Sequence, residues 1–304
     1  MSTRPRTTFR RDWGLTGRMF FVLTALALVY LGFVALLNWL GIPWGFIAVI
    51  AGVMLALQFF LSDKLVLWSM GARLVTPQQY PDLHRMIERL AAGAGLPKPK
   101  VAVVHNDIPN AFATGRSPGA SVVAVTTGIM RRLTAEELEG VLGHELSHIR
   151  HRDVMVITLA SFFATVAAML MQWLFWMSLF GGMGGGRRNQ AGAVLLIAYL
   201  ASVLVYFVAK LLLLALSRYR EYAADWAGAH LTGRPSWLAS ALQKISGAMA
   251  RIPTEDLRRV ETANAFFIVP ALKGDVVAEL FSTHPPVHKR VERLRRLARD
   301  LEGA

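Results

Sequence analysis

Four long apolar runs divide the chain, and polar stretches separate and flank them. The runs extend over residues 19–40, 43–61, 154–180 and 192–216. A helix rises 1.5 Å per residue, so a run of about 20 residues can cross a hydrocarbon core roughly 30 Å thick. The pattern therefore predicts an α-helical integral membrane protein with about four transmembrane helices, arranged as two hairpins.

The polar stretches indicate how the rest of the chain is organised. We expect a basic N-terminus, a first transmembrane hairpin, a mixed segment, a second hairpin and a second mixed segment. These parts correspond to residues 1–18, 19–62, 63–153, 154–216 and 217–304. The two mixed segments are expected to form the two parts of one domain outside the membrane.

The first mixed segment combines strand and helix patterns. Helical periodicity covers residues 80–95, which end on glycines, whereas β-branched runs at 100–107 and 119–128 predict strands. Residues 110–116 between them suggest a third strand at a sheet edge. Thr134 followed by Glu137 has the spacing of a capping box and predicts a helix over 135–152. A small sheet packed with helices is therefore expected.

Composition and charge narrow the possibilities further. Hydrophobic residues make up 54% of the chain and charged residues only 17%, as expected for a membrane protein. The chain has no cysteine, which excludes disulfides, thiolate nucleophiles and zinc–thiolate sites. The net charge of +13 comes from cationic residues that flank the apolar runs, so no nucleic-acid partner is predicted.

The cationic residues also predict an orientation. Five arginines precede the first run, namely Arg4, Arg6, Arg10, Arg11 and Arg18. They predict a cytoplasmic N-terminus, and the first hairpin returns the chain to the same side. The glycine-rich turn over residues 181–190 contains Arg187 and Arg188, which oppose this rule mildly. It stays open whether the second hairpin crosses fully.

The helix over residues 135–152 carries the sequence HELSH, in which two histidines lie four residues apart around a glutamate. Residues four apart share a helix face, so His144 and His148 can bind one zinc ion. Glu145 is turned about 100° away and can act as a general base on a water beside the metal. This H-E-x-x-H pattern predicts a zinc hydrolase centre, with capping or surface histidines as the alternative explanation.

A third ligand must come from elsewhere in the chain. Residues 217–228, just after the fourth apolar run, carry Glu221 and Asp225 four apart on one helical face. Glu221 can complete a set of two histidines and one glutamate, and Asp225 can accept the ring N–H of a ligating histidine. The alternative is a helix beside the membrane that is stabilised by salt bridges to Arg218 and Arg220.

Four segments together resemble the HtpX-type membrane metalloproteases, within the broader peptidase family that also contains the CAAX prenyl proteases. The segments are NAFATG at 110–115, HELSH at 144–148, SRYREYAAD at 217–225 and FSTHPPVHKRVERL at 281–294. The resemblance covers nearly the whole chain, and four spans fit the HtpX type, whereas the CAAX proteases carry more. It implies about four transmembrane helices and an α+β gluzincin-type cytoplasmic catalytic domain with a small sheet.

The resemblance also implies an activity. The chain is expected to be a zinc endopeptidase with one zinc ion, embedded in the cell membrane and active at the cytoplasmic face. The implied substrates are misfolded or damaged membrane proteins, and soluble ones as an extension, in protein quality control. A homo-oligomer is compatible with this reading.

Further site residues follow from the same resemblance. Asn110, Ala111 and Phe112 are implied as contacts of an extended substrate along an edge strand, although an ordinary hairpin strand explains the pattern too. His284 is implied as a catalytic residue that steadies the oxyanion, and a turn histidine before two prolines is its alternative. Arg290 is expected to form a structural ion pair.

Two other functions stay open at this stage. The chain can be a selective protease that processes lipidated or signal-like peptides. It can also be a membrane protein without activity, whose histidines bind a structural metal in a closed site with a fourth protein ligand.

Overall fold

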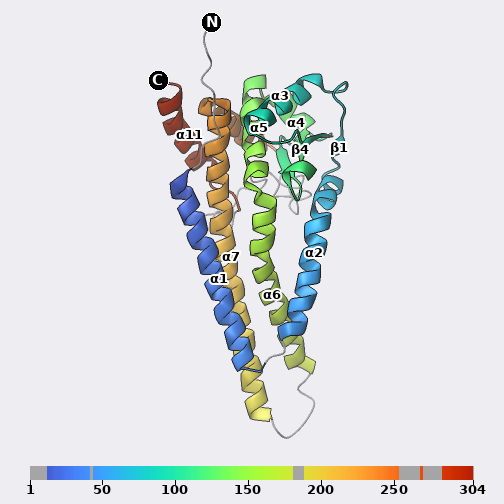
Figure 1. Cartoon of the computed structure of the whole chain (residues 1–304), viewed down its shortest axis with the longest axis vertical. Helices are drawn as coiled ribbons and strands as arrows, with labels where there is room; N and C mark the ends of the chain where they lie inside the picture. Colours follow the sequence, from blue (N-terminus) through green and yellow to red (C-terminus); the bar gives the residue numbers. More distant parts are fainter. Residues whose placement is uncertain (1–11, 42–43, 181–187, 253–267, 270–282, 304) are drawn as a thin grey trace. The chain divides into compact units, whose positions relative to one another are not determined.

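The computed structural model describes residues 12–41, 44–180, 188–252, 268–269 and 283–303 (Figure 1). Helices dominate, and short strands occur only in the segment between α2 and α4 among these residues. The long helices are α1 (Trp13–Trp39), α2 (Trp44–Ser69), α6 (Asp153–Phe180) and α7 (Arg188–Thr232). The shorter helices are α3 (Pro81–Gly93), α4 (Thr127–Arg132), α5 (Ala135–His151), α8 (Pro235–Met249), α11 (Val287–Leu301) and the 3-10 helix η1 (Pro118–Ala120).

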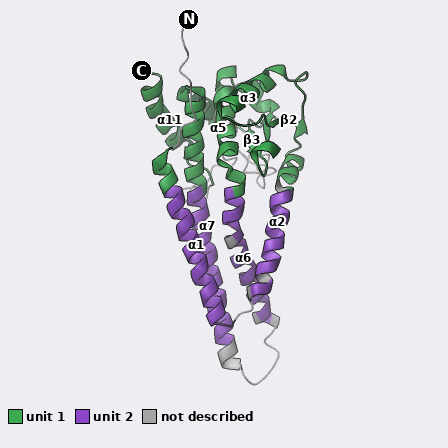
Figure 2. Ribbon diagram, viewed as in Figure 1, with its two compact units in different colours: residues 1–17, 61–155, 217–304 green, residues 18–60, 156–216 purple. Residues whose placement is uncertain are grey.

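Internal contacts divide the chain into two compact units, coloured separately in Figure 2. Unit 1 comprises residues 1–17, 61–155 and 217–304, and unit 2 comprises residues 18–60 and 156–216. Unit 1 is therefore assembled from stretches that are far apart in the sequence.

Unit 2 consists of parts of the four long helices. Three helical segments are long and apolar enough to cross a membrane, namely Trp13–Trp39, Asp153–Met177 and Gly192–Thr232. Residues Ala48–Leu61 and Asp63–Ser69 of α2, bent by 58° relative to each other, make a fourth if they form one span. Large apolar side chains such as Phe20 and Leu204 are 71% and 65% exposed, which suits contact with lipid rather than water.

Unit 1 contains a four-stranded mixed sheet. Its strands are β1 (Arg73–Leu74), β2 (Lys100–Val104), β3 (Ala111–Thr114) and β4 (Val122–Thr126), in the spatial order β1-β2-β4-β3. The β2 and β4 strands are parallel, and β1 and β3 pair antiparallel at the two edges. The edge strand predicted within residues 110–116 is therefore confirmed, whereas the two-residue strand β1 was not predicted.

Both faces of this sheet are buried. Successive side chains of a strand point to opposite faces, and here each set packs into a core of its own. Val101 and Val103 of β2 join a core that also contains apolar residues of α3, α5, α8 and α11. Ala102 and Val104 join a smaller cluster with Phe112 on the other face. This packing fixes β3 and α5 within one core, and these two elements carry part of the candidate site.

The observed helices extend the predicted spans. Helix α1 begins six residues earlier than predicted, and α7 continues without a break from Arg188 to Thr232, through the predicted boundary at residue 216. No proline interrupts α7, since the next one is Pro235. The predicted turn over 181–190 is wrong at its end, where Arg188 to Gln190 are helical, and residues 181–187 lie outside the described part. The predicted class, a mostly helical chain with three to four candidate spans and a small sheet, is confirmed.

Candidate metal centre

The first two candidate ligands come from α5, whose start is fixed by a capping box. The Thr134 side chain accepts a hydrogen bond from the Glu137 backbone N–H, and the Glu137 side chain accepts one from the Thr134 N–H. The predicted capping box is therefore confirmed. One turn separates His144 from His148 further along this helix, and their rings meet edge to face with centroids 4.6 Å apart.

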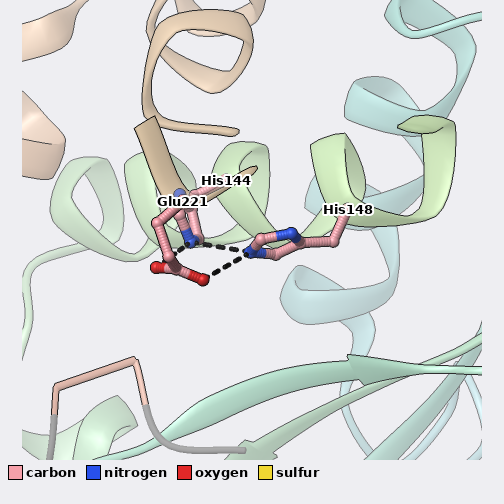
Figure 3. A group of neighbouring side chains, drawn as sticks. All are labelled: His144, His148 and Glu221. Atoms are coloured by element: carbon pink, nitrogen blue, oxygen red, sulfur yellow. Dashed lines mark hydrogen bonds and ion pairs between the residues drawn. The ribbon is translucent and has the colours of Figure 1, made fainter. Parts of the chain in front are cut away.

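The third candidate ligand comes from α7, which crosses α5 with the two backbones almost in contact. A Cβ atom placed on Gly228 of α7 would lie 2.7 Å from the backbone nitrogen of His144, closer than real Cβ contacts allow. Glycine at this position therefore permits the close approach. Two turns before Gly228, the Glu221 carboxylate reaches the two imidazoles of α5 (Figure 3).

Three side chains converge on one point. The Nε2 atoms of His144 and His148 are 3.1 Å apart, and the Glu221 oxygens lie 3.4 Å from His148 Nε2 and 3.7 Å from His144 Nε2. Two nitrogens bound at 2.0–2.1 Å to one tetrahedral zinc ion would be about 3.3 Å apart. The spacing and the donor set of two imidazoles and one carboxylate therefore fit a single zinc ion with an open fourth position.

Burial favours the neutral, ligating form of the first histidine. Desolvation lowers the pKa of His144, and a hydrogen bond from its ring to Asp225 only partly offsets this effect. The Nδ1 atom of His144 lies 3.0 Å from Asp225 Oδ1, so the Nε2 atom is left to face the metal position.

Asp225 is in turn held by Arg290, which is fully buried. Arg290 donates from Nε and from a terminal nitrogen to the two Asp225 oxygens, at 2.9 Å and 2.7 Å. The same guanidinium donates to the backbone oxygen of Ile268 at 2.9 Å and lies 3.2 Å from Glu221. The ion pair expected for Arg290 is thus present, and it joins α11 to α7 beneath the site.

The second histidine has a carboxylate partner that the sequence analysis did not single out. His148 Nδ1 lies 2.7 Å from Asp153 Oδ2, and Asp153 forms an ion pair with Arg220. The sequence offers Arg220 only as a salt-bridge partner in a helix beside the membrane. The sequence signal for this contact was an aspartate five residues after His148. On a continuous helix, however, that aspartate would point away from the His148 ring.

Glu145 lies in the same buried environment but outside the group of ligands. Burial raises its pKa to about 7, and a hydrogen bond from the Ala113 backbone opposes that rise. The carboxyl group therefore faces the edge strand β3, next to the metal position. A carboxyl group with this pKa exchanges protons readily near neutral pH.

The three residues predicted to contact substrate have buried side chains. Ala111 and Phe112 pack in the two cores of unit 1, on opposite sheet faces. Asn110 precedes them and accepts a hydrogen bond from the Ile268 backbone N–H through Oδ1, at 3.0 Å. Of the three, Ala111 directs its backbone groups to the outer edge of β3. Asn110 accepts a hydrogen bond from the Thr126 N–H of β4, and hydrogen-bonded pairs alternate along antiparallel strands, so the backbone of Phe112 also pairs with β4.

His284 lies against the metal ligands. Its Nδ1 atom is 3.1 Å from Glu221 Oε2, and the side chain is buried. The structure thus places it beside the carboxylate ligand, on the segment that leads into α11.

The chain is similar to one known protein family and to several named relatives. The model for Peptidase family M48 matches residues 77–298. A protein named Protease HtpX homolog from Moorella thermoacetica is 55% identical over 291 residues, which cover 96% of this chain and 97% of the relative. Protease HtpX homolog 2 from Methanosarcina acetivorans is 51% identical over 96% of this chain and 98% of its own length. Protease HtpX homolog 1 from Streptomyces coelicolor is 48% identical, with 98% of each chain covered.

A solved structure shares the fold. The crystal structure of S. mikatae Ste24p matches with a TM-score of 0.57 and 16% identity, over 93% of this chain and 67% of that chain. At this identity the likeness concerns the fold alone.

Proposed function

This chain belongs to peptidase family M48, and we propose that it is an endopeptidase that cleaves misfolded or damaged membrane proteins. As an HtpX-type member it is a multi-pass membrane metallopeptidase, and its zinc ligands are His144, His148 and Glu221. The observation that carries the substrate proposal is the position of β3, an edge strand whose backbone reaches Glu145 beside the metal.

An edge strand supports broad specificity. Its unpaired backbone groups can add one more extended strand by main-chain hydrogen bonds, which do not depend on sequence. Ala111 would contribute through its outward-facing backbone, whereas Phe112, whose side chain is buried and whose backbone pairs with β4, would support the strand from within. A pocket that begins at the C-terminal end of β3 has His148 in its wall, so a chain along β3 would lead to the metal. Asn110 would position this strand through the segment it binds at Ile268.

The catalytic roles follow from the chemistry of the residues. A bound zinc ion would act as a Lewis acid that polarises the scissile carbonyl and makes a nearby water more acidic. Glu145 would take a proton from the attacking water and deliver it to the leaving amine. Asp225 would hold His144 in the tautomer that directs Nε2 to the metal. His284, as a buried group beside Glu221, would steady the oxyanion by donating a hydrogen bond from its ring.

We place the N-terminus and unit 1 on the cytoplasmic side of the membrane. The five arginines before α1 support this orientation by the positive-inside rule. The proteins that the site would meet there are cytoplasmic segments of membrane proteins, and unfolded soluble chains as a second group.

The test uses full-length protein in detergent, stripped of metal and reloaded with zinc. Wild type should cut an unfolded model protein only with zinc, and Glu145→Gln should bind zinc but cut at least about 100-fold more slowly. Glu136→Gln makes the same chemical change at an exposed position of the same helix and should cut like wild type.

The outcomes separate the remaining alternatives. Near wild-type cleavage by Glu145→Gln would rule out Glu145 as the base. Zinc bound at one ion per chain, without cleavage of several unrelated unfolded proteins by wild type, would reject the broad substrate class in favour of a selective processing protease.

A further inference from the structure

The ring nitrogens of the two ligand histidines that face away from the metal position meet similar partners. His144 contacts Asp225, which is held by Arg290, and His148 contacts Asp153, which is held by Arg220. The sequence predicts the first contact, through Asp225, but not the second, through Asp153. We propose that Asp153 and Arg220 are positioning residues that hold His148 in the orientation and tautomer required for zinc binding.

The position of Asp153 depends on a break in the helix. On a continuous helix a residue five positions after His148 would be turned about 140° away from it and could not reach its ring. Here α5 ends at His151, and Arg152 adopts a left-handed conformation with φ 55° and ψ 43° before α6 begins at Asp153. Arg152 is the only non-glycine residue with positive φ among those that the structure describes. This break brings the Asp153 carboxylate to His148 Nδ1.

The Asp153 carboxylate is buried and therefore needs a positively charged partner. Asp153 and Arg220 are both buried, and a buried carboxylate without a partner is strongly disfavoured. The Arg220 guanidinium forms the ion pair with Asp153 and also donates to the backbone oxygen of His151 at 3.4 Å. It therefore holds both the carboxylate and the last turn of the ligand helix.

Arg220 also links the ligands to each other. It directly precedes Glu221 on α7, so one turn of that helix supplies the third ligand and the counter-ion behind the second one. A shift of α7 relative to α5 would thus displace Glu221 and release His148 together. The inference concerns zinc retention and is independent of the proposed substrate class, because it can be measured on protein to which no substrate is added.

The test measures the zinc affinity of the full-length protein in detergent by competition with a chelating dye. Asp153→Asn keeps the size of the side chain but removes its charge, and should weaken zinc binding about 10- to 100-fold, as the loss of such a histidine partner does elsewhere. The matched control is Asp107→Asn, which removes the carboxylate of the exposed Arg131–Asp107 ion pair and should leave zinc affinity unchanged. The visible absorption of cobalt-loaded Asp153→Asn should also shift, since the imidazole orientation changes.

A double-mutant cycle tests whether Asp153 and Arg220 act together on His148. Arg220→Met should weaken zinc binding about tenfold, and in the Asp153→Asn background it should add no more than about twofold. If Arg220→Met does not fold, Arg220→Lys replaces it, because lysine keeps the charge but not the paired donors, and a loss of about threefold or more is expected.

Three results would overturn the proposal. If Asp153→Asn binds zinc within twofold of wild type, Asp153 does not position His148. A lower melting temperature in that case would show only that Asp153 stabilises the fold. Losses that multiply in the double variant would show that the residues act separately. Unchanged zinc affinity in the Arg220 variants would show that Arg220 does not help to position His148.

Discussion

Glu137 anchors the ligand helix, and its replacement by alanine should destabilise unit 1 measurably. Its carboxylate accepts hydrogen bonds from the Thr134 backbone at 2.9 Å, from Ser240 at 2.6 Å and from Lys244 at 2.8 Å. The side chain is 8% exposed, so these bonds are shielded from solvent, although Lys244 itself is 47% exposed. Glu137 thereby joins the first turn of α5 to α8.

The expected loss can be estimated from these contacts. The Glu137 half of the reciprocal cap, its hydrogen bond from the Thr134 backbone, contributes about 1 kcal/mol, and the Thr134 half stays in the alanine variant. The hydrogen bond from Ser240 to a charged acceptor contributes about 1.5 kcal/mol, and the half-exposed Lys244 adds under about 1 kcal/mol. Glu137→Ala should therefore lower the free energy of unfolding by about 3 kcal/mol. For domains of 150–250 residues this corresponds to a fall in melting temperature of about 6–12 °C.

The loss should depend on pH in a defined direction. Burial raises the pKa of Glu137, but the hydrogen bonds from Lys244, Ser240 and Thr134 outweigh it and the pKa is lowered in the folded state. A lowered pKa means that the stabilisation is fully present above the unfolded value, about 4.3, and is lost as the pH falls through the folded value. The difference between wild type and Glu137→Ala should shrink accordingly below about pH 4.3.

The assay is thermal unfolding in detergent, followed by tryptophan fluorescence at several pH values. Glu136→Gln, on the same helix but exposed, serves as the control and should melt much closer to wild type than Glu137→Ala does. If Glu137→Ala melts within about 1 °C of wild type at neutral pH, the capping box and its bonds to α8 do not stabilise the helix that carries the ligands.

Two further predictions concern the backbone around the metal. Gly228→Ala places a Cβ atom 2.7 Å from the backbone nitrogen of His144, so it should separate α7 from α5 and cost about 2 kcal/mol, with at least tenfold weaker zinc binding. Gly247→Ala, where nothing lies within 4 Å, should instead be neutral or stabilising by up to about 1 kcal/mol, and equal melting of the two variants would refute the crowding argument. Arg152→Val should lower stability by about 1–2 kcal/mol relative to Arg152→Gly, because a β-branched residue tolerates the left-handed conformation poorly; a melting comparison that finds no difference would contradict this.

Features set by local rules could be predicted from the sequence. The apolar runs marked the candidate spans, Thr134 and Glu137 marked the start of the ligand helix, and the spacing of His144 and His148 placed both on one face. Glu221 could be identified because it lies just after the fourth apolar run and four residues before Asp225, in a spacing that the resemblance to zinc peptidases also supports. Each of these signals lies within a few residues of chain.

Features set by tertiary contacts could not be predicted in this way. The approach of Asp153 to His148 depends on a left-handed arginine, a residue type that gives no signal for that conformation. The side chain of Asn110 binds the backbone of Ile268, more than 150 residues away, so its type alone could not separate a substrate contact from a structural one. The two-residue strand β1 is too short for a periodic pattern.

The division of unit 1 into separate stretches has a consequence for the newly made chain. His144 and His148 precede residues 156–216 of unit 2, and Glu221 follows them. A ribosome therefore finishes both histidines and most of two more apolar helices before the carboxylate ligand exists. During that interval the growing polypeptide has only two of its three metal ligands. The order of synthesis thus delays a complete set of metal ligands until most of the last candidate span has been made.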